Sequence, residues 1–148
     1  MPQYNLDIAR TVLVGHSAGG HLALWAAVRG QLPADSQLHR DTPFVPCAVI
    51  SLADVGDLKA FAPFVPVICG PGIIERLTGA PPPTSRDAYA DISPAVLPAP
   101  EGHVVMISGI LDRLVPPMWP LIMRGRCELS GGPPSSWSTF PKRATSIW

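Results

Sequence analysis

The stretch TVLVGHSAGGHLALWAA, residues 11–27, combines three local signals. Thr11–Val14 is a run of β-branched and aliphatic residues, typical of a strand that is buried on both faces of a parallel sheet. A glycine-rich turn follows, and Ala18–Arg29 then carries the apolar residues of a helix that Gly30 is placed to end. The stretch therefore predicts a strand, a tight turn and a helix.

Two further apolar runs, Cys47–Leu52 and His103–Ser108, predict additional strands. The segments between the runs are helical or irregular in character, which requires crossover connections between parallel strands. We expect short helices at Ile73–Leu77 and around Ser85–Ala90, and a turn at Asp91–Pro94. The fold class is therefore α/β, with a mostly parallel sheet and flanking helices.

Composition narrows the function classes. The 148 residues fit one domain, with 47% hydrophobic and 15% charged residues, and the 11 basic residues equal the 11 acidic ones. This balance offers no attraction to nucleic acids or membrane surfaces. The three cysteines share no metal-ligand spacing, so we expect reduced thiols and no metal site. Nothing resembles a signal peptide at Met1, and we expect a soluble cytoplasmic domain.

The turn after the first strand has the pattern G-x-S-x-G, with Ser17 at its centre. Between a strand and a helix, this pattern is that of a nucleophile elbow. The turn is sharp enough that side chains two positions from the serine would collide, which predicts glycine at Gly15 and Gly19. The Ala18 N–H would then point to where an oxyanion forms. The alternative is a structural turn in which Ser17 caps the helix.

The corner resembles the elbow of the esterase branch of the α/β-hydrolase superfamily, particularly kynurenine-formamidase-like and related carboxylesterases. The resemblance continues through VISLADVGDL, YADISPAVLP and ISGILDRLVPP and covers residues 4–118. It implies a partial α/β-hydrolase fold whose front strands are missing, since only residues 1–10 precede the first strand. It also implies hydrolysis of a small ester or amide by Ser17, without a metal or organic cofactor.

The resemblance also assigns the acid of a catalytic triad. Residues 109–116, GILDRLVP, match the family pattern Gly-x-x-Asp-x-x-Val-Pro, so Asp112 inherits the role of orienting a histidine. The family more often has His-Gly where this chain has Ser108-Gly109. Asp54 and Asp57 are competing acids, which we interpret as helix caps or solvated turn residues.

No general base is found. The order along the chain in this fold is serine, acid, histidine, but all four histidines precede Asp112. We expect each to be satisfied elsewhere or to face solvent, with His103 at the opposite end of its strand. The four are His16, His21, His39 and His103.

The last part of the chain differs in character from the rest. We predict a partial α/β-hydrolase domain over residues 1–119 and an aberrant tail over residues 120–148, produced by a slip of reading frame. In the shifted frame, the last base of each codon and the first two bases of the next codon form a new codon. With suitable third bases, Ala144–Trp148 then reads Gly-His-Phe-Asp-Leu, which resembles the histidine motif that closes this family. The same shift permits strand-like residues over Ser136–Thr139.

The sequence thus indicates a serine hydrolase, truncated and weakly active or inactive, that self-associates through an exposed sheet edge. The alternative is a non-catalytic pseudo-hydrolase or a degraded reading frame. A proline-rich ligand and a dinucleotide site are weaker hypotheses, because neither P-x-x-P with basic neighbours nor G-x-G-x-x-G occurs. The apolar segment Phe61–Ile74 either lines an acyl pocket or is a packed connector.

Overall fold

The computed structural model describes Tyr4, Asp87 and residues 6–79, 89–100, 102–115 and 136–140. The helix expected around Ser85–Ala90 lies mainly outside these residues, and its last two residues form a turn. No helix in the described part of the chain is long and apolar enough to cross a membrane.

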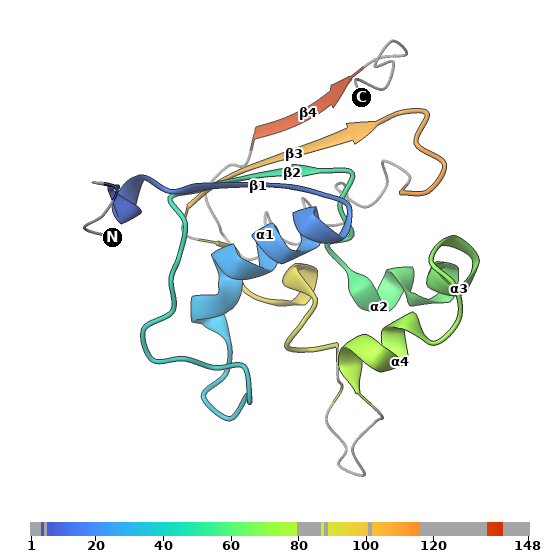
Figure 1. The fold of residues 1–148 in the computed structure, drawn as a ribbon, viewed down its shortest axis with the longest axis horizontal. Coiled ribbons are helices and arrows are strands. Elements are labelled where there is room, and N and C mark those ends of the chain that lie inside the picture. The colour runs from blue at the N-terminus through green and yellow to red at the C-terminus, as the bar shows by residue number, and fades with distance from the viewer. Residues whose placement is uncertain are drawn as a thin grey trace.

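The centre of the structure is a parallel sheet of four strands in the order β1-β2-β3-β4 (Figure 1). The strands are β1 (Val12–His16), β2 (Ala48–Leu52), β3 (His103–Gly109) and β4 (Ser136–Phe140). The first three confirm the three predicted strands. The fourth was not predicted, because no pattern after Trp119 indicated regular structure.

One long helix, α1 (Ala18–Val28), packs against a single face of this sheet (Figure 1). It confirms the predicted helix, and the 3-10 turn η2 (Arg29–Gln31) continues it. Burial of aliphatic side chains between helix and sheet is the main source of stability here, at about 25 cal/mol per Å² of apolar surface. The buried residues of this cluster are Ala23, Leu24, Ala27, Val49, Ala95, Val104 and Met106.

The connection between β2 and β3 is made of short helical pieces. They are α2 (Leu58–Phe61), η3 (Ala62–Phe64), α3 (Val65–Ile68), α4 (Ile73–Thr78) and η4 (Pro94–Val96). Figure 1 shows α2, α3 and α4 grouped to the lower right of the sheet. The predicted helix at residues 73–77 is confirmed by α4, and the predicted turn at residues 91–94 leads into η4.

A second hydrophobic cluster stabilises this connection. Prolines at the first turns of η3 and α3 fit there, since those backbone N–H groups have no helical partner anyway. The cluster is separate from the one beneath the sheet, so the short helices form a unit of their own beside it. Its buried members are Val55, Leu58, Phe61, Val65 and Val115.

The first strand lies at an edge of the described sheet. The 3-10 turn η1 (Ile8–Arg10) leads into β1, which pairs with β2 on one side only among the described strands. Leu13 packs against the cluster under the sheet, whereas Val12 is 47% and Val14 62% exposed on the other face. This edge presents unpaired backbone groups and apolar side chains.

Candidate active site

The corner between β1 and α1 holds Ser17 in a backbone conformation that non-glycine residues rarely adopt. Its φ is 55° and its ψ is −122°, and its side chain makes no capping hydrogen bond to the helix. Such a conformation costs on the order of 1–3 kcal/mol, so other contacts must maintain it. This strained conformation of a half-buried serine is the one expected of the predicted turn, and it differs from the alternative in which the Ser17 side chain caps α1.

The glycines around the serine do not all serve the same purpose. A Cβ added to Gly15 would lie 2.1 Å from the carbonyl oxygen of Gly19, so the strand and the helix meet too closely there for any side chain. A Cβ at Gly19 would meet nothing within 4 Å, and the steric reason predicted for this position is therefore wrong. The second crowded glycine is Gly20, where a Cβ would lie 2.7 Å from the Ser51 hydroxyl oxygen.

Two hydrogen bonds tie this corner to the end of β2. The Ser17 N–H donates to the carbonyl oxygen of Leu52 at 2.9 Å. Four residues further along, the His21 side chain donates from Nδ1 to the carbonyl oxygen of Val55 at 2.7 Å, and this contact is buried. The acceptor is a carbonyl, so Nδ1 carries the proton. The first turn of α1 is thus anchored to residues 52–55.

The sequence interpretation of Asp54 is wrong. This carboxyl is 0% exposed and accepts a hydrogen bond from the Ser51 hydroxyl at 2.6 Å, so it is neither a cap nor a solvated turn residue. Burial raises its pKa above the usual 3.8, and the Ser51 hydroxyl and the nearby His21 oppose that shift in part. Asp57, by contrast, caps α2 as expected, accepting from the Ala60 N–H at 3.0 Å.

Asp112 lies in a compact turn three residues after the end of β3. Its Oδ1 accepts the N–H groups of Leu114 and Val115, each at 2.9 Å, and its own N–H donates to the carbonyl oxygen of Gly109 at 3.0 Å. The carboxyl is half-buried, and its Oδ2 has no hydrogen-bond partner among the described residues. One oxygen therefore fixes the turn while the other stays available to orient a further group.

The sheet brings Ser17 and Asp112 to the same edge. The strands are parallel, and β1 and β3 flank β2 with their carboxyl ends in register, His16 pairing with Leu52 and Leu52 with Ile107. Two strand spacings separate the corners, about 10 Å between backbones. Ligand sites of open α/β sheets lie at this edge, and a group that contacts both side chains would have to lie in the gap between the two corners.

None of the four histidines occupies that gap. His16 is exposed at the end of β1, and His103 begins β3 at the opposite edge of the sheet. His39 binds the Leu32 carbonyl oxygen through Nδ1 at 3.0 Å, and His21 is committed to Val55. Within the described residues, no imidazole hydrogen-bonds to Asp112 or to the Ser17 hydroxyl.

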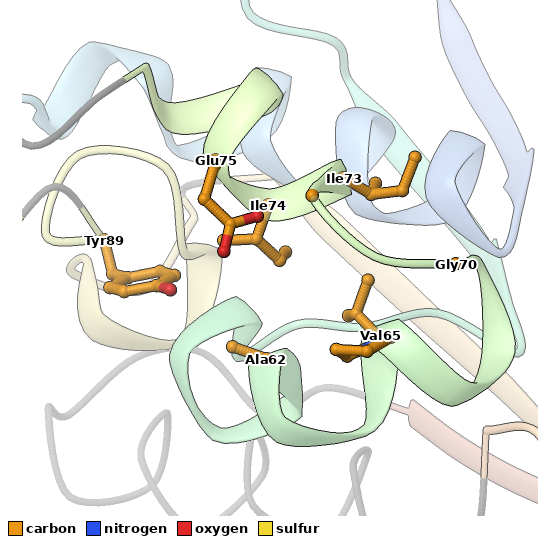
Figure 2. A pocket seen from close by; sticks show the side chains of 9 residues that line it. Ala62, Val65, Gly70, Ile73, Ile74, Glu75 and Tyr89 are labelled. Atoms are coloured by element: carbon orange, nitrogen blue, oxygen red, sulfur yellow. The ribbon is translucent and has the colours of Figure 1, made fainter.

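A small hollow of about 90 Å³ lies between α3 and α4 (Figure 2). Figure 2 shows Val65 and Ile74 facing it, with Glu75 and Tyr89 at its margin. Within the segment Phe61–Ile74, Phe61 packs in the second cluster as expected of a packed connector, while later residues line the hollow. The alternative that the segment lines an acyl pocket stays a prediction.

The described residues contain no group of three histidine, cysteine, aspartate or glutamate side chains arranged to hold a metal ion.

The sequence was compared with models of known protein families. The BD-FAE family model matches residues 1–121. No curated protein matches the chain.

Solved structures share the fold. An acylaminoacyl peptidase in complex with Z-Gly-Gly-Phe-chloromethyl ketone is 20% identical with a TM-score of 0.66, covering 95% of this chain and 20% of that chain. A truncated carbohydrate esterase from gut microbiota is 18% identical (TM-score 0.65; 93% and 53% covered). A lipase/esterase from Lactobacillus plantarum is 19% identical (TM-score 0.62; 95% and 51% covered). The chain thus spans about a fifth to about half of these structures, and its fold is a partial α/β-hydrolase fold.

Proposed function

Because the chain belongs to the BD-FAE family, which is α/β-hydrolase-like, we propose that it is a serine hydrolase that cleaves a small ester or amide through Ser17. The observation that carries the proposal is the strained backbone of Ser17, with φ 55° and no capping role for its side chain. Strain of this kind concentrates at functional sites, where it exposes a reactive group. A serine that served only to start a helix would adopt an ordinary extended conformation and cap it.

In the proposed reaction the Ser17 hydroxyl oxygen attacks the carbonyl carbon of the substrate. The carbonyl oxygen becomes an oxyanion, which accepts a hydrogen bond from the Ala18 N–H at the positive end of the α1 dipole. The bond to the leaving alcohol or amine then breaks, and the leaving group takes the proton that Ser17 gave up. Water repeats the sequence on the acyl-enzyme and releases the acid.

The proton must travel through a base, which Asp112 would orient. The pairing of Gly109 with Phe140 supports a position for it, because β4 ends at the same edge of the sheet as β3, which Asp112 follows. The proposed frame shift puts a histidine within residues 144–148, shortly after that strand. The family match also ends at residue 121, close to the predicted boundary at Trp119. We therefore propose that the tail replaces a segment that carried the histidine.

On this proposal the chain is a truncated enzyme of weak or no activity. No general base is found for Ser17 among the described residues, and removing one triad member forfeits most of the acceleration. The competing proposal is a non-catalytic pseudo-hydrolase or a degraded reading frame. It is favoured by the position of the four histidines, none of which contacts Asp112 or the Ser17 hydroxyl within the described residues.

Covalent labelling by a fluorophosphonate separates the two proposals. We expect slow labelling of the purified chain at Ser17, located by peptide mass spectrometry, and none of the Ser17→Ala variant. No labelling of Ser17 above that variant would favour the non-catalytic alternative. Sequencing the coding DNA with its flanks tests the frame shift, which is refuted if no homologous histidine motif lies in the shifted frame.

The position of β1 as an edge strand of the described sheet supports a further proposal, that the chain self-associates. Two apolar side chains of β1, Val12 and Val14, are exposed beside an edge that pairs on one side only among the described strands. A lysine on such an edge blocks strand addition. Val14→Lys should therefore shift the sedimentation profile towards the monomer, and an unchanged profile would argue against association through β1.

A further inference from the structure

The first turn of α1 depends on a short segment at the end of β2. Three contacts converge there: the Ser17 N–H on Leu52, the His21 side chain on Val55, and the backbone of Gly20 against Ser51. A Cβ on Gly20 would also lie 2.9 Å from the Cβ of Asp54. The helix turn that follows the serine therefore rests directly on these side chains.

The supporting segment is itself unusual. Ser51 and Asp54 are both 0% exposed and joined by a 2.6 Å hydrogen bond, although burying a carboxyl is unfavourable unless its contacts compensate. Between them, Ala53 has a φ of 45°, the second positive φ of a non-glycine residue among the described residues. Of the two strained residues, Ala53 thus lies within the buried polar segment, and Ser17 is hydrogen-bonded to Leu52 beside it.

We propose that Ser51, Asp54 and His21 form a positioning cluster that holds Ser17 and Ala18 in the strained elbow conformation and so sets the reactivity of the Ser17 hydroxyl. His21 clamps the first turn of α1 to Val55, while Ser51 and Asp54 form the surface on which Gly20 packs. The statement about reactivity rests on the proposed function. The statement about backbone conformation does not.

The cluster contains the residue types of a hydrolytic triad but is not a second active site. The Ser51 hydroxyl donates directly to Asp54, with no imidazole between them, and the Nδ1 proton of His21 goes to Val55. Neither Ser51 nor Asp54 is accessible to a substrate. Its three side chains act through the elbow.

Two buried serines offer a matched pair of variants. Ser51→Ala removes the hydroxyl from the cluster. Ser93→Ala removes a hydroxyl that is also 0% exposed and also makes one hydrogen bond, accepting the Leu58 N–H at 3.2 Å at the start of α2. Ser51→Ala should lower the free energy of unfolding more than Ser93→Ala does, because it withdraws the hydroxyl donor from a buried carboxyl. Only Ser51→Ala should alter the elbow.

The imidazole offers a rescue test. His21→Asn keeps an N–H donor at the δ position that can reach the Val55 carbonyl, whereas His21→Leu keeps the bulk and loses the donor. If the hydrogen bond from His21 to Val55 holds the elbow, the leucine variant should lose the elbow conformation and the asparagine variant should keep it.

Two measurements are made on the full chain, under conditions in which every variant is folded to the same extent. The first is amide hydrogen exchange over residues 17–21, which we expect to accelerate about tenfold in Ser51→Ala and His21→Leu and to stay within about twofold of wild type in Ser93→Ala and His21→Asn. The second is the rate of fluorophosphonate labelling at Ser17, which should fall about tenfold in the same two variants, because small displacements of a reacting group cost large factors in rate.

The outcomes separate the two proposals. Equal exchange rates in Ser51→Ala and Ser93→Ala would overturn the positioning role. Unchanged labelling in Ser51→Ala with accelerated exchange would overturn the link to reactivity. If the wild-type chain is not labelled at all, the proposed function fails, and hydrogen exchange alone still decides whether the cluster holds the elbow.

Discussion

The two corners at the carboxyl edge of the sheet are built in opposite ways. The Asp112 corner is closed by its own neighbours, since among the described residues its carboxylate and N–H bond only to Gly109, Leu114 and Val115. The Ser17 corner is strained and is held by residues more than thirty positions away, on and after β2. One corner is a local turn, and the other is a tertiary assembly.

This difference predicts how each corner responds to substitution. A local turn loses only the hydrogen bonds of the altered side chain, and the surrounding strands keep their positions. A strained corner transmits a small change to the packing of a helix on a sheet, because interiors are packed too densely to absorb added atoms. We therefore expect the largest effects of single methyl groups at the serine corner.

Gly15→Ala should give the largest effect. Its added Cβ would lie 2.1 Å from the Gly19 carbonyl oxygen, which forces β1 and α1 apart. We expect a loss of about 3 kcal/mol or more in the free energy of unfolding, measured by urea denaturation. Gly19→Ala is the matched control, because its Cβ meets nothing within 4 Å and alanine favours a helix. Equal destabilisation by the two variants would contradict the close crossing at Gly15.

Asp112→Ala should have a smaller effect on stability. It leaves the N–H groups of Leu114 and Val115 without their shared acceptor in a half-buried turn, which costs about 1–2 kcal/mol. Asp112→Asn keeps one oxygen for these donors and should cost less, while removing the charge that would orient a histidine. Thermal unfolding of both variants measures the difference. If the asparagine variant were the less stable, the local account of this corner would be wrong.

The contrast between the corners also explains what the sequence predicts. Strands β1 to β3 and helices α1 and α4 follow from apolar runs and their boundaries, which are local properties. The Asp112 turn follows from a motif for the same reason. The sequence alone cannot show which of Gly19 and Gly20 is crowded, since both are glycines in one turn and only the approach of β2 distinguishes them.

The errors have the same origin. Asp54 sits in a polar-looking segment, and its burial depends on α1 crossing over the end of β2. Strand β4 depends on pairing with β3, since a stretch rich in glycine, proline and serine precedes it and hides any periodicity. The domain boundary after residue 119 and the frame shift stay predictions.

Ser17→Gly should stabilise the chain relative to Ser17→Ala. Both variants remove the hydroxyl, but only glycine adopts a φ of 55° without a steric cost. We expect the glycine variant to be more stable by roughly 1 kcal/mol, measured by urea denaturation of the two side by side. A glycine variant no more stable than the alanine variant would show that Ser17 carries little strain, and the comparison between the two corners would lose its basis.

Asp54→Asn should produce the smallest change. It should appear in how the free energy of unfolding varies with pH. Burial raises the pKa of Asp54, so the folded chain keeps this proton to a higher pH than the unfolded chain does. The free energy of unfolding therefore falls as the pH rises from 3.8 through the raised pKa, and asparagine abolishes that part of the fall. His21 faces Asp54 in both proteins, so the substitution changes only the carboxyl. Urea denaturation from about pH 4 to about pH 8 tests this, and two parallel curves would show that the carboxyl is not buried as described.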